Sequence, residues 1–195
     1  MKKLFIILLG IIPTLFSCSH VDKKDVASVT NFINEESNAL KQVKEVEKVK
    51  YSLTYRPTVL MVNQEVGQGN DKQSKLKAYQ KYSPYYYFIL NLSIADKDAL
   101  YKGSNSQAQF SENIQKFSFQ MGDYVYAIDT DDTVRLADFY TPNMYGYAKS
   151  TEVLLVFDRS QIKGDQFKIN VEELGLGIGR QTFEFNKKDL EEIDH

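Results

Sequence analysis

Very few residues of this chain are suited to covalent or metal chemistry. Cys18 is the only cysteine among the 195 residues, and the only histidines are His20, beside it, and His195, at the last position. Nucleophilic catalysis needs a base held beside its nucleophile in a packed pocket, and neither histidine is well placed for that role. A zinc site would lack its usual nitrogen and sulfur ligands. We therefore expect no enzyme, no catalytic or metal site and no cofactor.

A glycine-rich stretch, Gly175 to Gly179, invites comparison with a phosphate-binding loop. Such loops lead from a strand into a helix N-terminus that faces the phosphate. Here residues 180–185 follow, and their pattern is that of a strand. We expect these glycines to allow a bulge or a close approach of two backbone segments instead.

Acidic residues gather in several places without forming a recognisable site. The segment Asp129-Thr130-Asp131-Asp132 resembles the start of a calcium loop, but the central glycine and closing glutamate are missing, so we predict a hairpin turn. Paired acids occur at 35–36, 172–173 and 191–192. Hydrolysis of glycosides needs two carboxylates that face one another across a cleft, which adjacency in sequence does not supply. A carboxylate-based hydrolase is an alternative that would need an open cleft with two facing acids.

The N-terminus has the layout of an export signal. Lys2 and Lys3 precede thirteen uncharged residues, 4–16, and the run ends in Leu15-Phe16-Ser17-Cys18. A membrane-spanning helix needs about 20 apolar residues, so this run is too short to span the bilayer and is typical of a signal peptide.

The junction at Cys18 resembles the lipobox of bacterial lipoproteins. The resemblance implies removal of residues 1–17 and attachment of diacylglycerol, with fatty chains such as palmitate, to the Cys18 sulfur; Phe16 is larger than the residue usual at its position. Each buried CH₂ group contributes about 0.8 kcal/mol to membrane binding, so one fatty chain anchors a protein weakly whereas two or three anchor it firmly. The alternative is an ordinary secreted protein whose cysteine is incidental.

The same resemblance implies an address in the cell envelope. Richness in Lys, Asn and Tyr together with the junction around Cys18 resembles lipoproteins of Bacteroidota. Ser19 after the lipid-bearing cysteine implies the outer membrane, with a periplasmic or a surface-facing orientation left open.

Composition narrows the classes of partner. The formal net charge is −2, so there is no broad basic surface and we expect no binding of nucleic acid. Without residues 1–17 the chain has the usual size of one domain. With Cys18 lipidated no disulfide can form, so the hydrophobic core must hold the fold by itself.

The segment before residue 47 is expected to act as an anchor and stalk. Apolar residues recur at intervals of three and four from Asp22 to about Val43, which predicts a helix that Asp22 could cap. The alternative is a solvated tether. We divide the chain into signal peptide (1–17), lipid anchor with a helical or flexible stalk (18–46) and a β domain (47–195).

From residue 48 onward the apolar period changes to two, which predicts strands. The first covers residues 48–55, and a polar loop with a possible helical turn at 76–79 follows. The strongest strand follows Pro84, and further strands are predicted at 114–121, 124–129, 133–140, 145–148, 152–158, 166–172 and 181–185, before a final helical turn toward Ile193. Short strands at this spacing predict a mainly β, antiparallel β-sandwich of the immunoglobulin-like kind with about seven to nine strands; a small β-barrel is the alternative.

Tyrosine-rich segments are the main candidates for a contact surface. Tyr140, Tyr145 and Tyr147 surround a Pro-Asn turn, and rigid amphipathic rings are favoured in protein interfaces. The alternative is that such rings line the core and the sheet rim. Our first hypothesis is therefore a membrane-anchored lipoprotein whose non-catalytic sandwich contacts or helps to assemble other envelope proteins; the second is a glycan- or small-ligand-binding lipoprotein.

Overall fold

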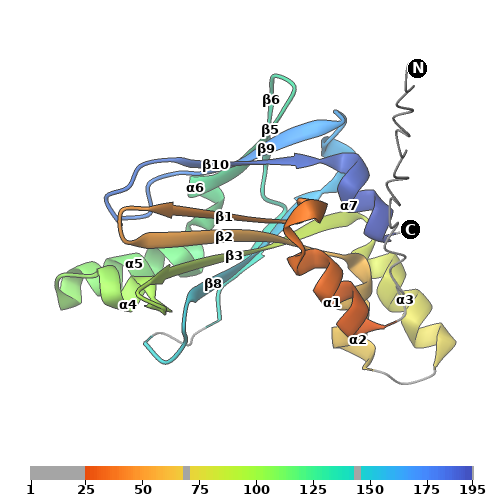
Figure 1. Ribbon diagram of the computed structural model, residues 1–195, viewed down its shortest axis with the longest axis horizontal. Helices are drawn as coiled ribbons and strands as arrows, with labels where there is room; N and C mark the ends of the chain where they lie inside the picture. The colour runs from red at the N-terminus through yellow and green to blue at the C-terminus, as the bar shows by residue number, and fades with distance from the viewer. Residues whose placement is uncertain (1–24, 68–70, 143–145, 195) are drawn as a thin grey trace, which may run out of the picture.

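The computed structural model describes residues 25–67, 71–142 and 146–194. These residues form two antiparallel sheets with helices at both ends (Figure 1). Helices account for slightly more residues than strands, so the prediction of a mainly β fold holds for the sheets but not for the helix content. Cys18, both histidines and the signal peptide lie outside the described residues. The lipid attachment at Cys18 therefore stays a prediction.

The larger sheet has six antiparallel strands in the order β1-β2-β3-β8-β7, with the short β4 paired to β3. The central position of β3 suits its run of aromatic and branched residues, which favour a pleated surface buried on one side. The strands are β1 (Lys41–Val46), β2 (Val49–Arg56), β3 (Tyr85–Ile94), β4 (Lys97–Asp98), β7 (Asp138–Tyr140) and β8 (Thr151–Asp158).

The smaller sheet has four antiparallel strands in the order β10-β9-β5-β6. They are β5 (Val125–Asp129), β6 (Asp132–Arg135), β9 (Gln166–Val171) and β10 (Gln181–Asn186). The predicted hairpin turn at 129–132 is confirmed, since Asp129 pairs with Asp132 and Thr130 takes a positive φ of 57°.

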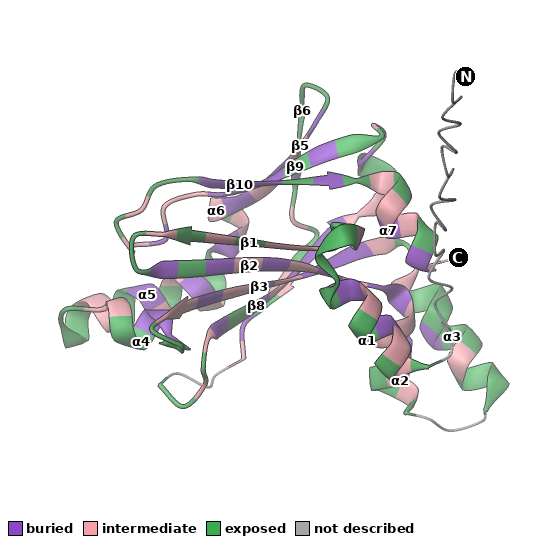
Figure 2. Ribbon diagram, in the orientation of Figure 1, coloured by how far each residue is buried: buried purple, intermediate pink, exposed green. Residues whose placement is uncertain are grey.

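The hydrophobic core lies between the two sheets. Alternate residues of β3 point into it: Phe88 lies 4.9 Å, between ring centroids, from Phe185 of the smaller sheet, and Tyr86 lies 6.0 Å from Phe167. All four side chains are at most 2% exposed. Buried positions alternate with intermediate or exposed ones along β2 and β10 (Figure 2). The opposite face of β3 is the outer face of the larger sheet, and it carries Ile89, Asn91 and Ser93.

Helices make up more of the fold than the sequence pattern indicated. The helices α1, α2, α3 and α7 lie near one end of the sheets, and α4 and α5 lie near the other (Figure 1). Their bounds are α1 (Val26–Asn34), η1 (Glu36–Asn38), α2 (Thr58–Val66), α3 (Lys72–Tyr82), α4 (Ala99–Gly103), α5 (Gln107–Phe119), α6 (Met121–Tyr124), η2 (Arg159–Gln161) and α7 (Lys187–Asp194). The helical turns predicted near residues 76–79 and near the C-terminus correspond to α3 and α7.

The stalk expected over residues 18–46 is wrong for its described part. The helix α1 begins after the cap Asp25 and ends at Asn34, and its apolar face, with Val29 and Ile33, is buried in the common core. Ala39 then takes a positive φ of 54°, and the chain turns into β1, which pairs with β2 along its whole length. The apolar spacing was read correctly up to Ile33, but pairing with β2 overrides any helical tendency after Leu40.

The strand predicted at 114–121 is also wrong, because these residues belong mainly to α5. Ser106 caps this helix by accepting a hydrogen bond from the Gln109 N–H at 3.1 Å. The alternation of Phe117 and Phe119 misled the prediction. In the helix they lie on different faces, with Phe117 fully buried and Phe119 79% exposed.

Two further strand predictions need correction. Residues 133–140 form two strands in different sheets, β6 and β7, separated by Leu136 and Ala137. Residues 146–148, expected in a strand at 145–148, form a turn and bend. The other predicted strands are confirmed, with shifts of one or a few residues at their ends.

The edges of the two sheets meet along β1 and β10 without a backbone ladder. The Gln42 side chain accepts a hydrogen bond from the Glu184 N–H at 3.3 Å and donates one to the Glu184 carbonyl oxygen, while Lys44 donates to the Thr182 carbonyl oxygen. Within the described residues the two sheets therefore do not close into a barrel, contrary to the alternative raised from sequence.

The C-terminal helix α7 is joined to the larger sheet by a buried ion pair. Asp194 accepts hydrogen bonds from Arg159, from the Tyr55 hydroxyl at 2.5 Å and from the Thr58 N–H at 2.8 Å. The guanidinium also lies 4.3 Å from the centre of the Tyr86 ring. Helix, sheet and the start of α2 are thereby held together.

Candidate functional site

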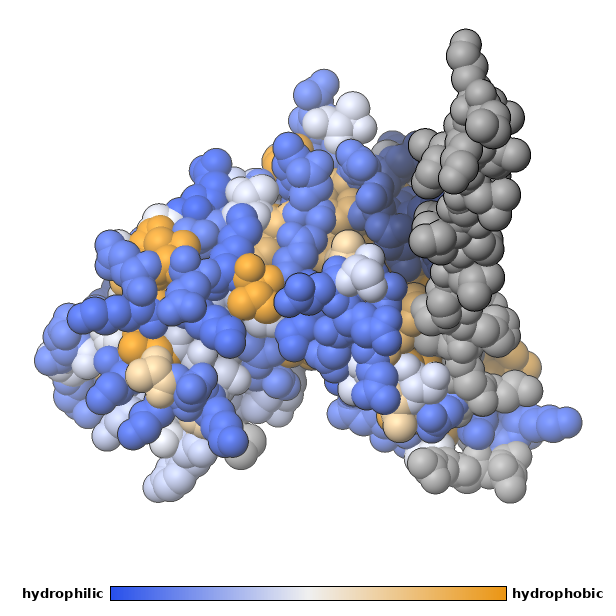
Figure 3. All heavy atoms as spheres, in the orientation of Figure 1, coloured by the Kyte–Doolittle hydropathy of each residue, from blue (hydrophilic) through white to orange (hydrophobic). Residues whose placement is uncertain are grey.

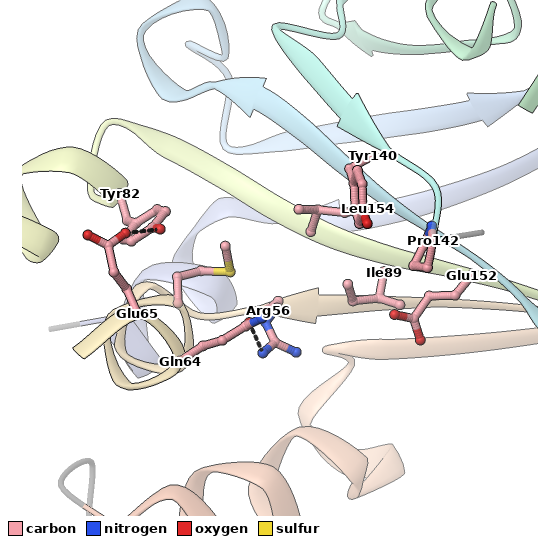
Figure 4. Close-up of a pocket in the computed structure, with 10 residues that line it drawn as sticks. Arg56, Gln64, Glu65, Tyr82, Ile89, Tyr140, Pro142, Glu152 and Leu154 are labelled. Atoms are coloured by element: carbon pink, nitrogen blue, oxygen red, sulfur yellow. Dashed lines mark hydrogen bonds between the residues drawn. The ribbon is translucent and has the colours of Figure 1, made fainter. Parts of the chain in front are cut away.

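A groove of about 420 Å³ lies on the outer face of the larger sheet, between α2 and β7. Side chains of β2, β3 and β8 form its floor, and α2, the end of α3 and the end of β7 form its sides (Figure 4). Its lining combines apolar residues (Met61, Ile89, Pro142, Leu154), two tyrosines (Tyr82, Tyr140) and four charged or amide side chains (Arg56, Gln64, Glu65, Glu152).

Sheet register explains why the floor residues meet. On the outer face, Ile89 of β3 pairs with Thr54 of β2 and with Leu154 of β8, and Tyr140 of β7 pairs with Leu154. Pro57 ends β2 and stands as the cap residue before α2, which brings α2 over this face. Met61 then packs with Tyr87 and Val156 and closes one end of the groove.

Arg56 provides a fixed positive charge in the groove. Its guanidinium donates a hydrogen bond to the Gln64 side-chain oxygen at 2.8 Å. Partial burial lowers the pKa of Arg56, and the Glu152 carboxylate works in the opposite direction. An arginine remains protonated after such a shift, so the group can bind a carboxylate, a hydroxyl or a carbonyl oxygen.

The two acids of the groove do not face one another. Glu65 accepts hydrogen bonds from Lys81 at 2.5 Å and from the Tyr82 hydroxyl, and its carboxylate points toward Tyr82, away from Glu152 (Figure 4). These two hydrogen bonds lower the pKa of Glu65. A general acid for glycoside cleavage needs a raised pKa, so Glu65 has the opposite character.

An aromatic and aliphatic surface adjoins these polar groups. Tyr140 stands beside Leu154 at the edge of the groove, and its side chain is 62% exposed. Ile89 and Leu154 offer a partly buried apolar floor. Such a surface suits a flat ligand with one apolar and one polar face.

The predicted contact tyrosines are only partly brought into this site. Tyr140 lines the groove, Tyr147 is 95% exposed and is not part of the groove lining, and Tyr145 lies outside the described residues. In a second tyrosine-rich segment, residues 82–87, Tyr86 and Tyr87 are buried, which matches the alternative that such rings line the core.

The glycine-rich stretch binds a carboxylate of its own chain. Glu173 accepts hydrogen bonds from five consecutive backbone N–H groups, those of residues 175–179, at 2.5–2.9 Å. Gly175, Gly177 and Gly179 have positive φ values of 68–90°, which let the loop curl around the carboxylate. The glycines therefore enclose a side-chain carboxylate, which differs from the expected bulge or close approach of two backbone segments, whereas the strand expected after them, β10, is present.

The carboxylate of Asp129 has a structural role. It accepts hydrogen bonds from the Lys163 N–H at 2.5 Å and the Gly164 N–H at 3.0 Å, and so joins the β5–β6 hairpin to the turn before β9. No group of three or more Cys, His, Asp or Glu residues is arranged to hold a metal ion among the described residues.

Sequence reasoning missed most of the groove. Arg56, Gln64 and Glu152 come from separate elements, and only the sheet register brings them together. One usable signal existed: Arg56 ends the alternating run of β2 on its polar face, directly before Pro57.

Comparisons of this chain with protein-family models, with curated proteins and with solved structures found no match. No helix in the described part of the chain is long and apolar enough to cross a membrane.

Proposed function

We propose that this chain is a lipid-anchored, non-catalytic binding protein of the bacterial cell envelope that holds a glycan or another hydroxyl-rich small molecule in the outer-face groove. The anchor is Cys18 and the membrane is the outer membrane, as the lipobox resemblance implies. The folded part is a β-sandwich, and the comparison with immunoglobulin-like domains rests on its two facing antiparallel sheets.

The groove is the single observation that carries this proposal. It combines an exposed aromatic ring, Tyr140, with a fixed cation, Arg56, and with carboxylate and amide groups that can pair with hydroxyls. Sugars have apolar faces and hydroxyl edges, so they need this combination. The hydrogen bonding of Glu65 and its orientation away from Glu152 favour binding over hydrolysis.

An oligosaccharide array probed with the purified full chain tests the proposal. Tyr140→Ala should weaken binding at least tenfold, because the ring forms one side of the groove. Tyr147→Ala is the matched control: it removes the same side chain from a site outside the groove lining and should change affinity less than twofold. Failure of every oligosaccharide to bind, or equal binding by the Tyr140→Ala variant, would contradict the proposal.

Protein interaction is a second candidate, favoured by the high exposure of Tyr140 and Tyr147. On the face shown in Figure 3, hydrophobic residues occur in small separate groups among hydrophilic ones, without a large continuous patch. The test is affinity capture from membranes with the unmodified chain and with Tyr140→Ala, Tyr145→Ala and Tyr147→Ala. Loss of a reproducible envelope partner only in these variants would support this candidate, and capture of no reproducible partner would oppose it.

A further inference from the structure

A second hollow, of about 300 Å³, lies on the same outer face of the larger sheet. Short polar side chains form its floor and three lysines surround it. The floor includes Ser52, Asn91 and Ser93, and the lysines are Lys41, Lys50 and Lys149. The groove holds an aromatic ring and an arginine, whereas this hollow offers mainly hydroxyl, amide and ammonium groups.

The groove and the hollow are neighbours along the strands, although they share no lining residue. Asn91 pairs with Ser52 of β2 on one side and with Glu152 of β8, which lines the groove, on the other. On β2, Arg56 lines the groove and Lys50 lines the hollow, which places them about 20 Å apart at 3.3 Å per residue. A ligand that fills both must be elongated, several sugar units long.

The hollow is the positive end of this face. Lys50 and Lys149 are exposed, and the ion pairs found among the described residues are formed by other cations, namely Lys81, Arg159, Arg180 and Lys187. Three acids neighbour the lining residues in the sheet register, namely Glu45 opposite Lys50, Asp98 opposite Ser93 and Glu152 opposite Asn91, and none of them is part of the lining. Asp98 is buried and accepts hydrogen bonds from the Leu100 and Gly146 N–H groups, and Glu152 lines the groove. The hollow therefore complements a negatively charged ligand group.

We propose that the ligand of this face is an acidic oligosaccharide, of which one sugar ring stacks on Tyr140 while carboxylate groups of other units bind Lys50 and Lys149. This inference rests on the proposed function of the groove. The floor of Ser and Asn side chains fits hydroxyl groups, which both donate and accept hydrogen bonds. A peptide that adds to a sheet needs a free strand edge, whereas this site is a sheet face.

The test is titration calorimetry with the full chain and a panel of acidic oligosaccharides, namely fragments of hyaluronan, alginate and polygalacturonate. Each is compared with the same fragment after its carboxyl groups have been reduced to alcohols. We expect at least one acidic fragment to bind at least tenfold more tightly than its reduced form and to lose affinity as sodium chloride is raised.

Charge-matched variants locate the effect. The double variant Lys50→Gln, Lys149→Gln should weaken the affinity for the acidic fragment at least tenfold and leave the affinity for its reduced form unchanged within twofold. The control variant Lys72→Gln, Lys188→Gln removes two exposed lysines outside the lining of the hollow and should change neither affinity. Circular dichroism checks that both variants remain folded.

Three results would overturn the inference. Equal binding of acidic and reduced fragments would contradict the proposal that the ligand is acidic, but the proposal that the groove binds sugars would still stand. Equally tight binding of a single-stranded DNA oligomer would show attraction to any polyanion. Absence of binding by every fragment in both forms would oppose this inference; binding of a neutral oligosaccharide on the array would then show that the groove function survives alone.

Discussion

Glu173 shows how a single side chain can determine the conformation of a loop. One of its oxygens accepts hydrogen bonds from the N–H groups of Gly175, Leu176 and Gly177, and the other accepts them from Ile178 and Gly179. Bonds from backbone N–H groups to a carboxylate are stronger than neutral ones. Leu174, at the start of this loop, is fully buried, so the loop is also fixed to the core.

Replacement of this carboxylate should destabilise the fold. In Glu173→Gln one oxygen becomes an NH₂ group, so at least two loop N–H groups face a donor and lose their acceptor. We expect the free energy of unfolding to fall by about 2 kcal/mol, measured by urea unfolding. Glu172→Gln is the control. Glu172 accepts a hydrogen bond from the Tyr126 hydroxyl and forms an ion pair with Arg180 at the surface, so the substitution should lower the free energy of unfolding by less than about 1 kcal/mol. Equal losses in the two variants would contradict this explanation.

The same carboxylate predicts a dependence on pH. Partial burial acts to raise the pKa of Glu173, but the hydrogen bonds from the loop outweigh it and the pKa is lowered. A lowered pKa in the folded state gives stability that is fully present above the unfolded pKa of about 4.3 and is lost as the pH falls through the folded pKa. The difference between the unmodified chain and Glu173→Gln should therefore be constant above about pH 5 and shrink below about pH 4. A gap that grew in acid would be the opposite result.

At the scale of residues, unusual residues could be singled out from the sequence, but the residues that lie beside them in the fold could not. The spacing of Gly175, Gly177 and Gly179 was visible, and the strand after them was predicted, yet the acceptor they surround was not. Glu173 was visible only as one of a pair of adjacent acids. Likewise Tyr140 could be singled out, but Arg56 and Glu152 could not, because register across three strands brings them together.

Among the elements, α7 is attached to the larger sheet by one buried ion pair, between Asp194 and Arg159. Asp194 is almost fully buried, and its partner Arg159 is bonded also to the Tyr85 carbonyl oxygen at 2.9 Å. Removal of one partner from such a pair leaves the other charge buried without compensation, which costs more than the intact pair contributes.

Asp194→Asn should lower the free energy of unfolding by about 3 kcal/mol, with increased hydrogen exchange in α7. Lys188→Gln, on the exposed side of the same helix, should change stability by less than about 0.5 kcal/mol. If the Asp194→Asn variant were as stable as the unmodified chain, the ion pair would not be what fixes α7.

The elements best predicted were those with a long, one-sided pattern. In β3 the inner residues 86, 88, 90 and 92 are all fully buried, and this ten-residue strand was predicted correctly. Errors arose where a short pattern fitted two structures. Phe117 and Phe119 alternate as in a strand, but the cap at Ser106 and the burial of Asn113 and Phe117 on one side favour α5. Lys41–Val46 was assigned to the end of a helix, up to about Val43, and to a helical or flexible stalk, because no local signal shows its pairing with β2.

At the scale of the whole molecule, the proposal joins a folded body to a membrane through one residue. Cys18→Ser should yield a chain that carries no diacylglycerol and keeps residues 1–17, because the lipobox resemblance implies that processing requires lipid on the sulfur. Intact-mass analysis measures both effects. An unmodified Cys18 in the mature protein, or a Cys18→Ser variant that has lost residues 1–17 at the same position, would contradict the tether. Ser17→Ala is a control expected to keep the lipid.

The contact between β1 and β10 affects whether strands of neighbouring molecules can pair with each other. Both strands end their sheets, and the backbone groups of Thr182 and Glu184 that face β1 are occupied by the side chains of Gln42 and Lys44. Free strand edges serve as templates for intermolecular pairing and aggregation. Because these two side chains occupy the outer edge of β10, copies of this chain at high local concentration cannot add a strand to the smaller sheet at that edge.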